Sequence, residues 1–266
     1  MLKTELKKII FSPQYIICVV LLFALLMLGT VGLWSDTLGG ETISMLVHFL
    51  NAWDTMGNVY IVVPLLASVP VTFLLHDELN SGYIHFSITR AGKRKYIVTK
   101  MMTGILSGLL MVLIAELLFT VMLILLTPGK VNFLDQQQAL GDDSNFYLDM
   151  VRSGKGYFVY IIWVLLAGLY GAVFSAMAVA TSAVARNKYV AAVVPFLIFL
   201  LAENVFFYFM YLPLILRAGF EAIFFPCLAY EWLSGIPISL GIVLLWTLAS
   251  AVLFWTVIHR KIKGRG

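Results

Sequence analysis

The chain has 266 residues, of which 61% are hydrophobic and only 12% are charged, and its formal net charge is +4. A soluble domain contains about 45–50% apolar and about 25% charged residues, so one water-soluble core of this length could not bury so many apolar side chains. This composition excludes a soluble enzyme, a disordered chain and a disulfide scaffold, and it predicts an integral membrane protein.

The few charged residues bracket six long apolar stretches. Each stretch exceeds the roughly 20 residues that a helix needs to cross about 30 Å of hydrocarbon, and none alternates polar with apolar residues as barrel strands do. We therefore expect an all-α polytopic fold, with six transmembrane helices in a single transmembrane domain of residues 1–266. The predicted spans are 14–34, 57–76, 101–127, 157–185, 189–211 and 236–258.

The first 13 residues predict a short amphipathic helix at the membrane interface (residues 1–13). Leucine and isoleucine side chains can share one face of this helix, while Lys3, Lys7 and Lys8 face the lipid headgroups. Pro13 then marks the break into the first span, because proline is tolerated in the first turn of a helix and not inside it.

The basic residues predict the orientation of the chain in the membrane. With six crossings both termini lie on one side, and that side holds all but four of the 18 lysine and arginine residues. The four on the other side are Lys130, Arg152, Lys155 and Arg217. The positive-inside rule then places both termini in the cytoplasm of a multi-pass protein in a plasma membrane, which we take to be bacterial. The lipid bilayer accounts for the basic balance, and no nucleic acid is needed as a partner.

Four connecting segments follow from this topology. Residues 44–53 (SMLVHFLNAW) are half apolar and are expected to lie on the outer membrane surface. Residues 77–100 form an inner loop, and residues 128–156 form the large extracellular loop. Residues 212–235 are too apolar for a free loop and too short for two more crossings, which predicts a re-entrant extracellular segment rich in interfacial aromatic residues.

The chain lacks the motifs of an enzyme that acts by itself. There is no G-x-x-x-x-G-K-[ST] phosphate loop, no H-E-x-x-H and no G-x-S-x-G. The four histidines are dispersed and the cysteine and histidine spacing fits no metal site. We therefore expect no catalytic residue, no bound cofactor and no metal in this chain, and an intramembrane enzyme is disfavoured.

The inner loop 77–100 is the most informative polar segment. Asp77 and Glu78 directly follow the second span, where two carboxylates at a helix C-terminus would oppose the helix dipole. The conflict disappears if a new helix starts there, which predicts a short helix from Leu79 to Ser87 lying across the membrane.

Two interpretations of this loop are open on spacing alone. One is a solvated loop with basic residues held inside. The other is a docking element, in which an apolar knob is surrounded by positive charge suited to an acidic partner surface. The residues of this element are Tyr83, Ile84, Phe86 and Ile88 for the knob, and Arg90, Lys93, Arg94 and Lys95 for the charge.

These residues resemble a known family. The run HDELNSG at 76–82, followed by ITRAGKRKY at 88–96 and by Lys100, is similar to the segment that enters and leaves the coupling helix in the membrane subunits of ABC exporters of the type-2, ABCG-like permease family. The likeness extends to the interfacial N-terminal helix, the six spans and the re-entrant segment before the last span. Matched position by position, the resemblance implies that Glu78 and Gly82 open the coupling helix, and that Ile88-Thr89-Arg90 with Tyr96 and Lys100 form the return to the third span.

The resemblance implies a permease subunit that contains no ATPase of its own. ATP and Mg²⁺ would be held by two separate cytoplasmic ABC ATPase subunits, and a second copy or a homologous permease would complete the transporter. The cargo of such an exporter would be hydrophobic or amphipathic: a peptide (an antimicrobial peptide, for example), a drug or a lipid. The implied ATPase-docking residues are Glu78, Gly82, Tyr83, Ile84, Phe86, Arg90, Lys93 and Arg94.

Two acids lie inside the apolar spans, Glu116 in the third and Glu203 in the fifth. A carboxylate at membrane depth is costly, and such residues face a bundle interior or a water-filled cavity. They are candidates for a substrate path, or they are packing acids. The alternatives to an ATP-driven permease are a secondary transporter that uses Glu116 as a proton site, and a membrane sensor or assembly subunit that transports nothing.

Small residues recur every four positions along the fourth span, in one row through Gly168 and a second row through Gly171 and Ser175. Such rows let helix backbones approach one another closely. We expect this ladder to pack the fourth span against another helix of the same chain.

Overall fold

The computed structural model describes residues 2–39, 42–55, 59–81, 83–129, 131–132, 150–208 and 235–263. Nearly all of these residues are helical, and the chain is an all-α polytopic membrane protein, as predicted. The helices are α1 (Leu2–Ile10), α2 (Pro13–Gly29), α3 (Val31–Gly39), α4 (Met45–Leu50), the π-helix η1 (Asn51–Thr55), α5 (Val59–Asn80), α6 (Tyr83–Ala91), α7 (Lys93–Leu126), α10 (Gly156–Val184), α11 (Lys188–Tyr208) and α13 (Gly235–Lys263). Two short strands, β1 (Ile43–Ser44) and β2 (Val131–Asn132), pair in parallel.

Within the described residues, four helices are long and apolar enough to cross a bilayer: α5, α7, α10 and α13. A fifth crossing results if α1 and α2, which meet at a bend of 60°, are counted as one span. In α11 the apolar stretch within the described part, Lys188–Leu201, is shorter. The six-span arrangement therefore stays a prediction.

The bend between α1 and α2 follows from two adjacent residues. The hydroxyl of Ser12 accepts a hydrogen bond from the Tyr15 N–H at 3.3 Å and donates one to the Ile9 carbonyl at 2.7 Å. Ser12 thus caps α2 while satisfying the end of α1. Pro13 occupies the first turn of α2, where its missing N–H costs nothing.

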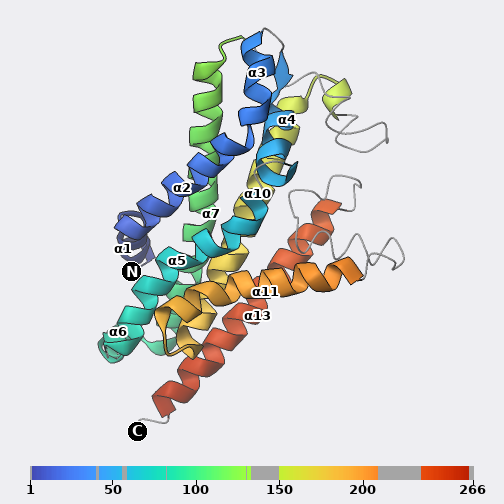
Figure 1. The fold of residues 1–266 in the computed structure, drawn as a ribbon. Helices are drawn as coiled ribbons and strands as arrows, with labels where there is room; N and C mark the ends of the chain where they lie inside the picture. The colour runs from blue at the N-terminus through green and yellow to red at the C-terminus, as the bar shows by residue number, and fades with distance from the viewer. Residues whose placement is uncertain are drawn as a thin grey trace.

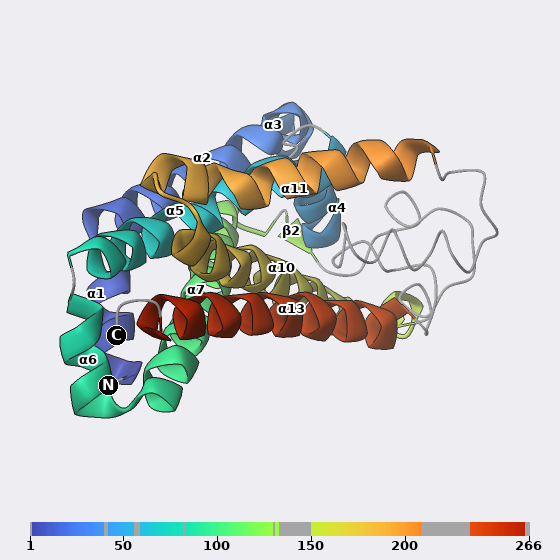
Figure 2. The ribbon, with the colours of Figure 1, turned by 90° about the horizontal axis from the view of Figure 1, so that it is seen from below.

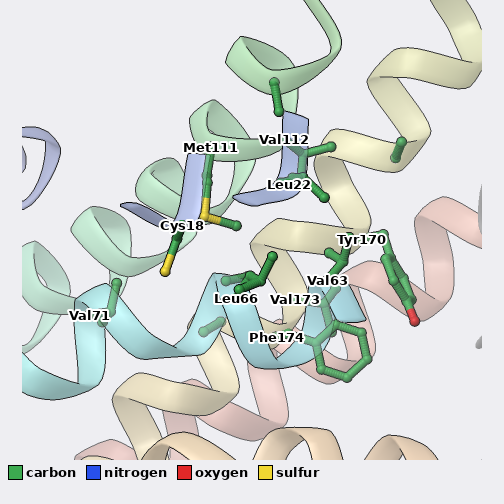
Figure 3. Packing of buried hydrophobic residues seen from close by; sticks show 14 of the residues in the cluster. Cys18, Leu22, Val63, Leu66, Val71, Met111, Val112, Tyr170, Val173 and Phe174 are labelled. Carbon is green, nitrogen blue, oxygen red and sulfur yellow. The ribbon is translucent and has the colours of Figure 1, made fainter. Parts of the chain in front are cut away.

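The interior of the bundle is built around α10, which packs against α5, α7, α11 and α13. Side chains from four helices meet there, as Figure 3 shows for Leu22 of α2, Leu66 of α5, Met111 of α7 and Phe174 of α10. The long apolar faces that stay exposed, on α7 and α13 above all, suit contact with lipid chains.

Glycine lets α7 and α10 approach most closely. A Cβ atom added at Gly171 would lie 2.6 Å from a methyl group of Val112 and 2.8 Å from the carbonyl oxygen of Gly108, both on α7. The second row of small residues, with Gly171 and Ser175, therefore packs against another helix of the same chain. Gly168 of the first row faces Leu109 and Leu113 of α7.

Both described ends of the chain lie at one end of the molecule, together with α1 and α6 (Figures 1 and 2). The helices α5 and α7 run away from this end (Figure 2), and α3 and α4 lie towards the opposite end (Figure 1). We call the end that holds α1 and α6 the α6 end.

The helix that the sequence predicts at residues 79–87 lies a few residues later. Helix α5 continues through Asp77 and Glu78 to Asn80, α6 begins at Tyr83, and α7 begins at Lys93. The two carboxylates therefore stand in the last turn of α5, against the helix dipole. They are tolerated because lysines from other helices neutralise them, as described next.

The segment 44–53, expected on the membrane surface, is instead packed into the interior. Met45, Phe49 and Trp53 are almost completely buried. The rings of Phe49 and Trp53 contact aromatic rings of α10, among them Phe49 with Trp163 in a tilted arrangement at 5.7 Å between ring centroids. Burying these large rings removes more apolar surface from water and headgroups than an interfacial position would.

Candidate functional site

Three consecutive residues in the last turn of α5 each contact a different part of the molecule. The Nε2 atom of His76 lies 3.1 Å from the carbonyl oxygen of Arg186, in the turn between α10 and α11. The carboxylate of Asp77 lies 3.6 Å from the Nζ atom of Lys188, the first residue of α11. Glu78 points to α7 and α1. We call His76, Asp77 and Glu78 the α5 clamp.

Glu78 belongs to a buried ion-pair triad with Lys100 of α7 and Glu5 of α1. The Lys100 Nζ atom lies 2.5 Å from Glu78 Oε2 and 2.6 Å from Glu5 Oε2. The Lys100 side chain is only 7% exposed. The hydroxyl of Tyr96, one turn earlier on α7, donates a hydrogen bond to Glu78 Oε1 at 3.1 Å. Lys100 of α7 therefore links α1 and α5 through its two salt bridges.

The pKa of Glu5 reports the charge balance of the triad. Glu5 lies on α1, the helix that precedes the first apolar span. Partial burial by itself would raise the pKa of the Glu5 carboxyl. The hydrogen bond and positive charge of Lys100, assisted by Lys8, outweigh burial and hold this pKa below its ordinary value. The triad thus keeps the Glu5 carboxyl ionised at neutral pH.

Helix α6 leaves the clamp and presents a mixed surface. Ile84 is buried and Ile88 packs partly against the core, whereas the Phe86 ring is 75% exposed. Arg90 is exposed beside it. This arrangement anchors one face of α6 on the bundle and leaves an aromatic side chain and a guanidinium outside.

The basic residues that follow divide into two groups. Arg94 and Lys95 are exposed. Lys93 is half-buried, and its Nζ atom contacts the Nδ1 atom of His259 near the end of α13. Of the docking residues that the sequence predicts, Gly82 lies outside the described residues, as does the side chain of Tyr83, the first residue of α6.

A groove of about 530 Å³ separates α6 from α1. Its walls include Thr4 and Lys8 from α1, and Phe86, Arg90 and Lys95 from the α6 side. The exposed residues of α6 are therefore continuous with the polar face of α1. The sequence of the loop 77–100 did not indicate that α1 would form part of this surface.

The predicted path acid Glu116 lies at a second, fully buried position, about two-thirds of the way along α7. The indole N–H of Trp53, from the π-helix η1, donates to its Oε1 atom. The Oε2 atom has no hydrogen-bond partner among the described residues. One turn on, the Thr120 hydroxyl donates to the Glu116 carbonyl oxygen and contacts the Tyr160 hydroxyl, each at 2.7 Å.

Aromatic rings surround this acid. Phe49 stacks on Trp53 at 5.7 Å between ring centroids and meets the Tyr160 ring edge-on at 5.9 Å. The sequence placed Trp53 in an outer loop and so missed its role as the partner of Glu116. The side chain of the second predicted path acid, Glu203 of α11, lies outside the described residues. The structure therefore does not show Glu116 and Glu203 facing a common path.

Neither a protein-family model, nor a curated protein, nor a solved structure matches the chain. Within the described part of the chain, no group of three or more histidine, cysteine or acidic residues could hold a metal ion. The features that bear on function are therefore the α6 end and the buried Glu116.

Proposed function

We propose that the chain is the permease subunit of an ATP-driven ABC exporter for a hydrophobic or amphipathic cargo such as a peptide, a drug or a lipid. The observation that carries this proposal is the placement of α6. This short helix lies at the end of the bundle that holds both described chain ends, with Phe86 and Arg90 exposed, and it directly follows the α5 clamp.

The contacts of the clamp supply a mechanism for coupling. A force applied to α6 by ATPase subunits would reach α1 and α7 through the salt bridges of Glu78 and Lys100. It would reach the α10–α11 hairpin through His76 and Asp77. Two packed arrangements of these helices, biased by ATP, would then alternate the access of a path between two permease copies.

The assembly follows from the same proposal. Two cytoplasmic ATPase subunits would hold ATP and Mg²⁺, because the sequence carries no phosphate loop. The α6 end, with α1 at the membrane interface and both termini, would face the cytoplasm of a plasma membrane. Six spans, a re-entrant segment at 212–235 and a second permease copy complete the arrangement.

Copurification from native membranes tests the proposal. The charge-reversal variant changes the exposed residues Arg90, Arg94 and Lys95 to glutamate and spares Lys93, because Lys93 contacts α13. We expect the wild-type chain to retain an ATPase subunit and the variant to lose it, since reversed charge at a docking surface repels an acidic partner.

The matched control reverses Arg152 and Lys155, which are exposed next to the start of α10. This variant is expected to retain the ATPase subunit. A wild-type chain that purifies without any ATPase, or a docking variant that keeps it as firmly as the control does, would contradict the proposal.

The uncompensated Oε2 atom of buried Glu116 favours one second candidate, a proton-coupled secondary transporter. In that case transport by the purified chain in vesicles would follow a proton gradient and would collapse in Glu116→Gln. An ATP-driven permease predicts instead that the purified chain shows no gradient-driven transport.

A further inference from the structure

A second cavity at the α6 end has amphipathic walls. It encloses about 400 Å³ between α1, α5 and α7, a size typical of small-molecule sites. One side is apolar and consists of Ile9, Val71, Leu74 and Leu75. Leu74 is also partly exposed, so the apolar part of the lining continues to the surface of the molecule.

The other side of the cavity is lined by ionisable groups of both signs. Three carboxylates, Glu5, Asp77 and Glu78, stand against two ammonium groups, Lys8 and Lys100. Lys188, which pairs with Asp77, brings the ammonium groups to three, so the charge around the cavity is balanced. Balanced charge offers no excess of positive groups to a purely anionic ligand, in contrast to the basic pockets that bind anionic lipids. It favours a ligand that carries charges of both signs.

Two of these groups keep hydrogen-bonding capacity for a ligand. Lys100 and Glu78 are engaged with each other at 2.5 Å. The Lys8 side chain, by contrast, is 55% exposed and reaches Glu5 only at 3.4 Å. Asp77 is 65% exposed and meets Lys188 only at 3.6 Å. The cavity thus presents one available ammonium group and one available carboxylate beside an apolar wall.

We propose that this cavity binds one membrane phospholipid whose headgroup carries a primary amine, of the phosphatidylethanolamine class. Lys8 donates to the phosphate, Asp77 accepts from the amine, and an acyl chain lies along Val71, Leu74 and Leu75. The site depends only on the chain being a membrane protein and does not require the transport function proposed above. The bound lipid fills the space between α1 and the α5 clamp.

Native mass spectrometry of the full-length protein tests this site. The protein is released from bilayers that contain equal amounts of phosphatidylethanolamine, phosphatidylcholine and phosphatidylglycerol, and the retained lipids are counted. We expect about tenfold more phosphatidylethanolamine than either other lipid, the ratio produced by one charge-assisted hydrogen bond of ordinary strength. Phosphatidylcholine has no N–H donor, and phosphatidylglycerol has no amine.

Three variants locate the site. Asp77→Asn should abolish the preference over phosphatidylcholine, Lys8→Gln should lower retention of phosphatidylethanolamine, and Leu74→Trp should exclude the acyl chain. The control Lys3→Gln makes the same charge change on an exposed part of α1 away from the cavity, and it should leave retention unchanged.

Several results would overturn the proposal. Equal retention of the three lipids, or a preference for phosphatidylglycerol, would show that the amine is not recognised. Retention that survives both Lys8→Gln and Leu74→Trp would show that the lipid binds elsewhere. A wild-type protein that copurifies with an ATPase but retains the three lipids without selectivity would rule out the lipid site and leave the permease proposal intact.

Discussion

At the scale of single residues, the molecule depends on how a few charged and polar groups are paired inside an apolar bundle. Lys100 neutralises Glu5 and Glu78 from two other helices, and Trp53 donates to Glu116. His48 of α4 is completely buried, and both its ring nitrogens lack a hydrogen-bond partner among the described residues. Each of these groups was placed by contacts between segments far apart in the sequence.

We expect Lys100→Met to lower the free energy of unfolding by about 3 kcal/mol, because it removes the positive charge that Glu5 and Glu78 share in a mostly buried place. The triple variant Glu5→Gln, Lys100→Met and Glu78→Gln should recover most of this loss, since no charge remains unpaired. Unfolding in mixed micelles measures both, with Lys3→Met as the control on α1. A Lys100→Met protein as stable as wild type would show that the triad contributes nothing.

A second residue-scale prediction concerns pH. Burial lowers the pKa of His48, which lies outside the candidate spans, to about 4, against about 6.5 in an unfolded chain. Between these values the unfolded state binds a proton that the folded state does not, so stability is complete above pH 6.5 and falls as the pH decreases. The loss approaches about 3 kcal/mol near pH 4.

Thermal unfolding of the wild type and of His48→Phe between pH 7 and pH 5 measures this effect. As the pH decreases, the free energy of unfolding of the wild type should fall by up to about 1.4 kcal/mol per pH unit. His48→Phe should not show this decrease. Parallel pH profiles for the two proteins would contradict the burial of a neutral His48.

At the scale of elements, the close approach of α7 and α10 and the clamp at the end of α5 determine how the helices are arranged. The rows of small residues in α10 predicted close packing within the chain, and the partner turned out to be Gly104 and Gly108 of α7. By contrast, the charge pattern misplaced the start of α6. The pattern could not show that lysines on other helices would neutralise Asp77 and Glu78.

We expect Gly108→Ala to destabilise the protein by about 2 kcal/mol, because overpacking a tight interface costs about 1–3 kcal/mol. The added Cβ would lie 2.5 Å from the Ser175 Cβ and 2.9 Å from the Gly171 carbonyl carbon, so the two helices must separate. Gly241→Ala is the matched control, since its Cβ would meet nothing within 4 Å. If the two substitutions changed the unfolding transition equally, the close packing of α7 against α10 would be refuted.

At the scale of the whole molecule, both described chain ends, α1 and α6 lie at one end of the bundle (Figure 1). Most of the lysine and arginine residues were assigned to that same side from the sequence. An even number of crossings and the positive-inside rule account for the agreement. By length and composition, the described residues contain four or five crossings. The expectation of six crossings stays a prediction.

Labelling of single cysteines with an impermeant maleimide tests this topology, in a background where Cys18 and Cys227 are serine. We expect Lys3→Cys and Arg90→Cys to react only in inverted vesicles, where the cytoplasmic side is open, and Arg152→Cys to react only on intact cells. All three positions are exposed. Reaction of Lys3→Cys and Arg90→Cys from opposite sides would contradict the placement of α1 and α6 at one end.

The sequence by itself determined the class of the protein and the position of most helices along the chain. Inside lipid every backbone N–H and C=O must be satisfied within its own segment, so an apolar run of 20 or more residues has little choice but to form a helix. That constraint acts within each segment, so the spacing of the charged residues along the sequence is enough to locate the helices. For the same reason α5, α7, α10 and α13 are found within a few residues of the predicted spans, except that α7 starts earlier at Lys93.

The tertiary structure alone decided which residues meet. Lys100 pairs with Glu5 across 95 positions, and Trp53 reaches Glu116 across 63. Such contacts depend on how each helix is rotated and tilted against its neighbours, which close packing determines. Burial of residues 44–53 is another such result, because a half-apolar segment suits an interface as well as a core. The α5 clamp, the cavity beside it and the buried acid follow from that packing.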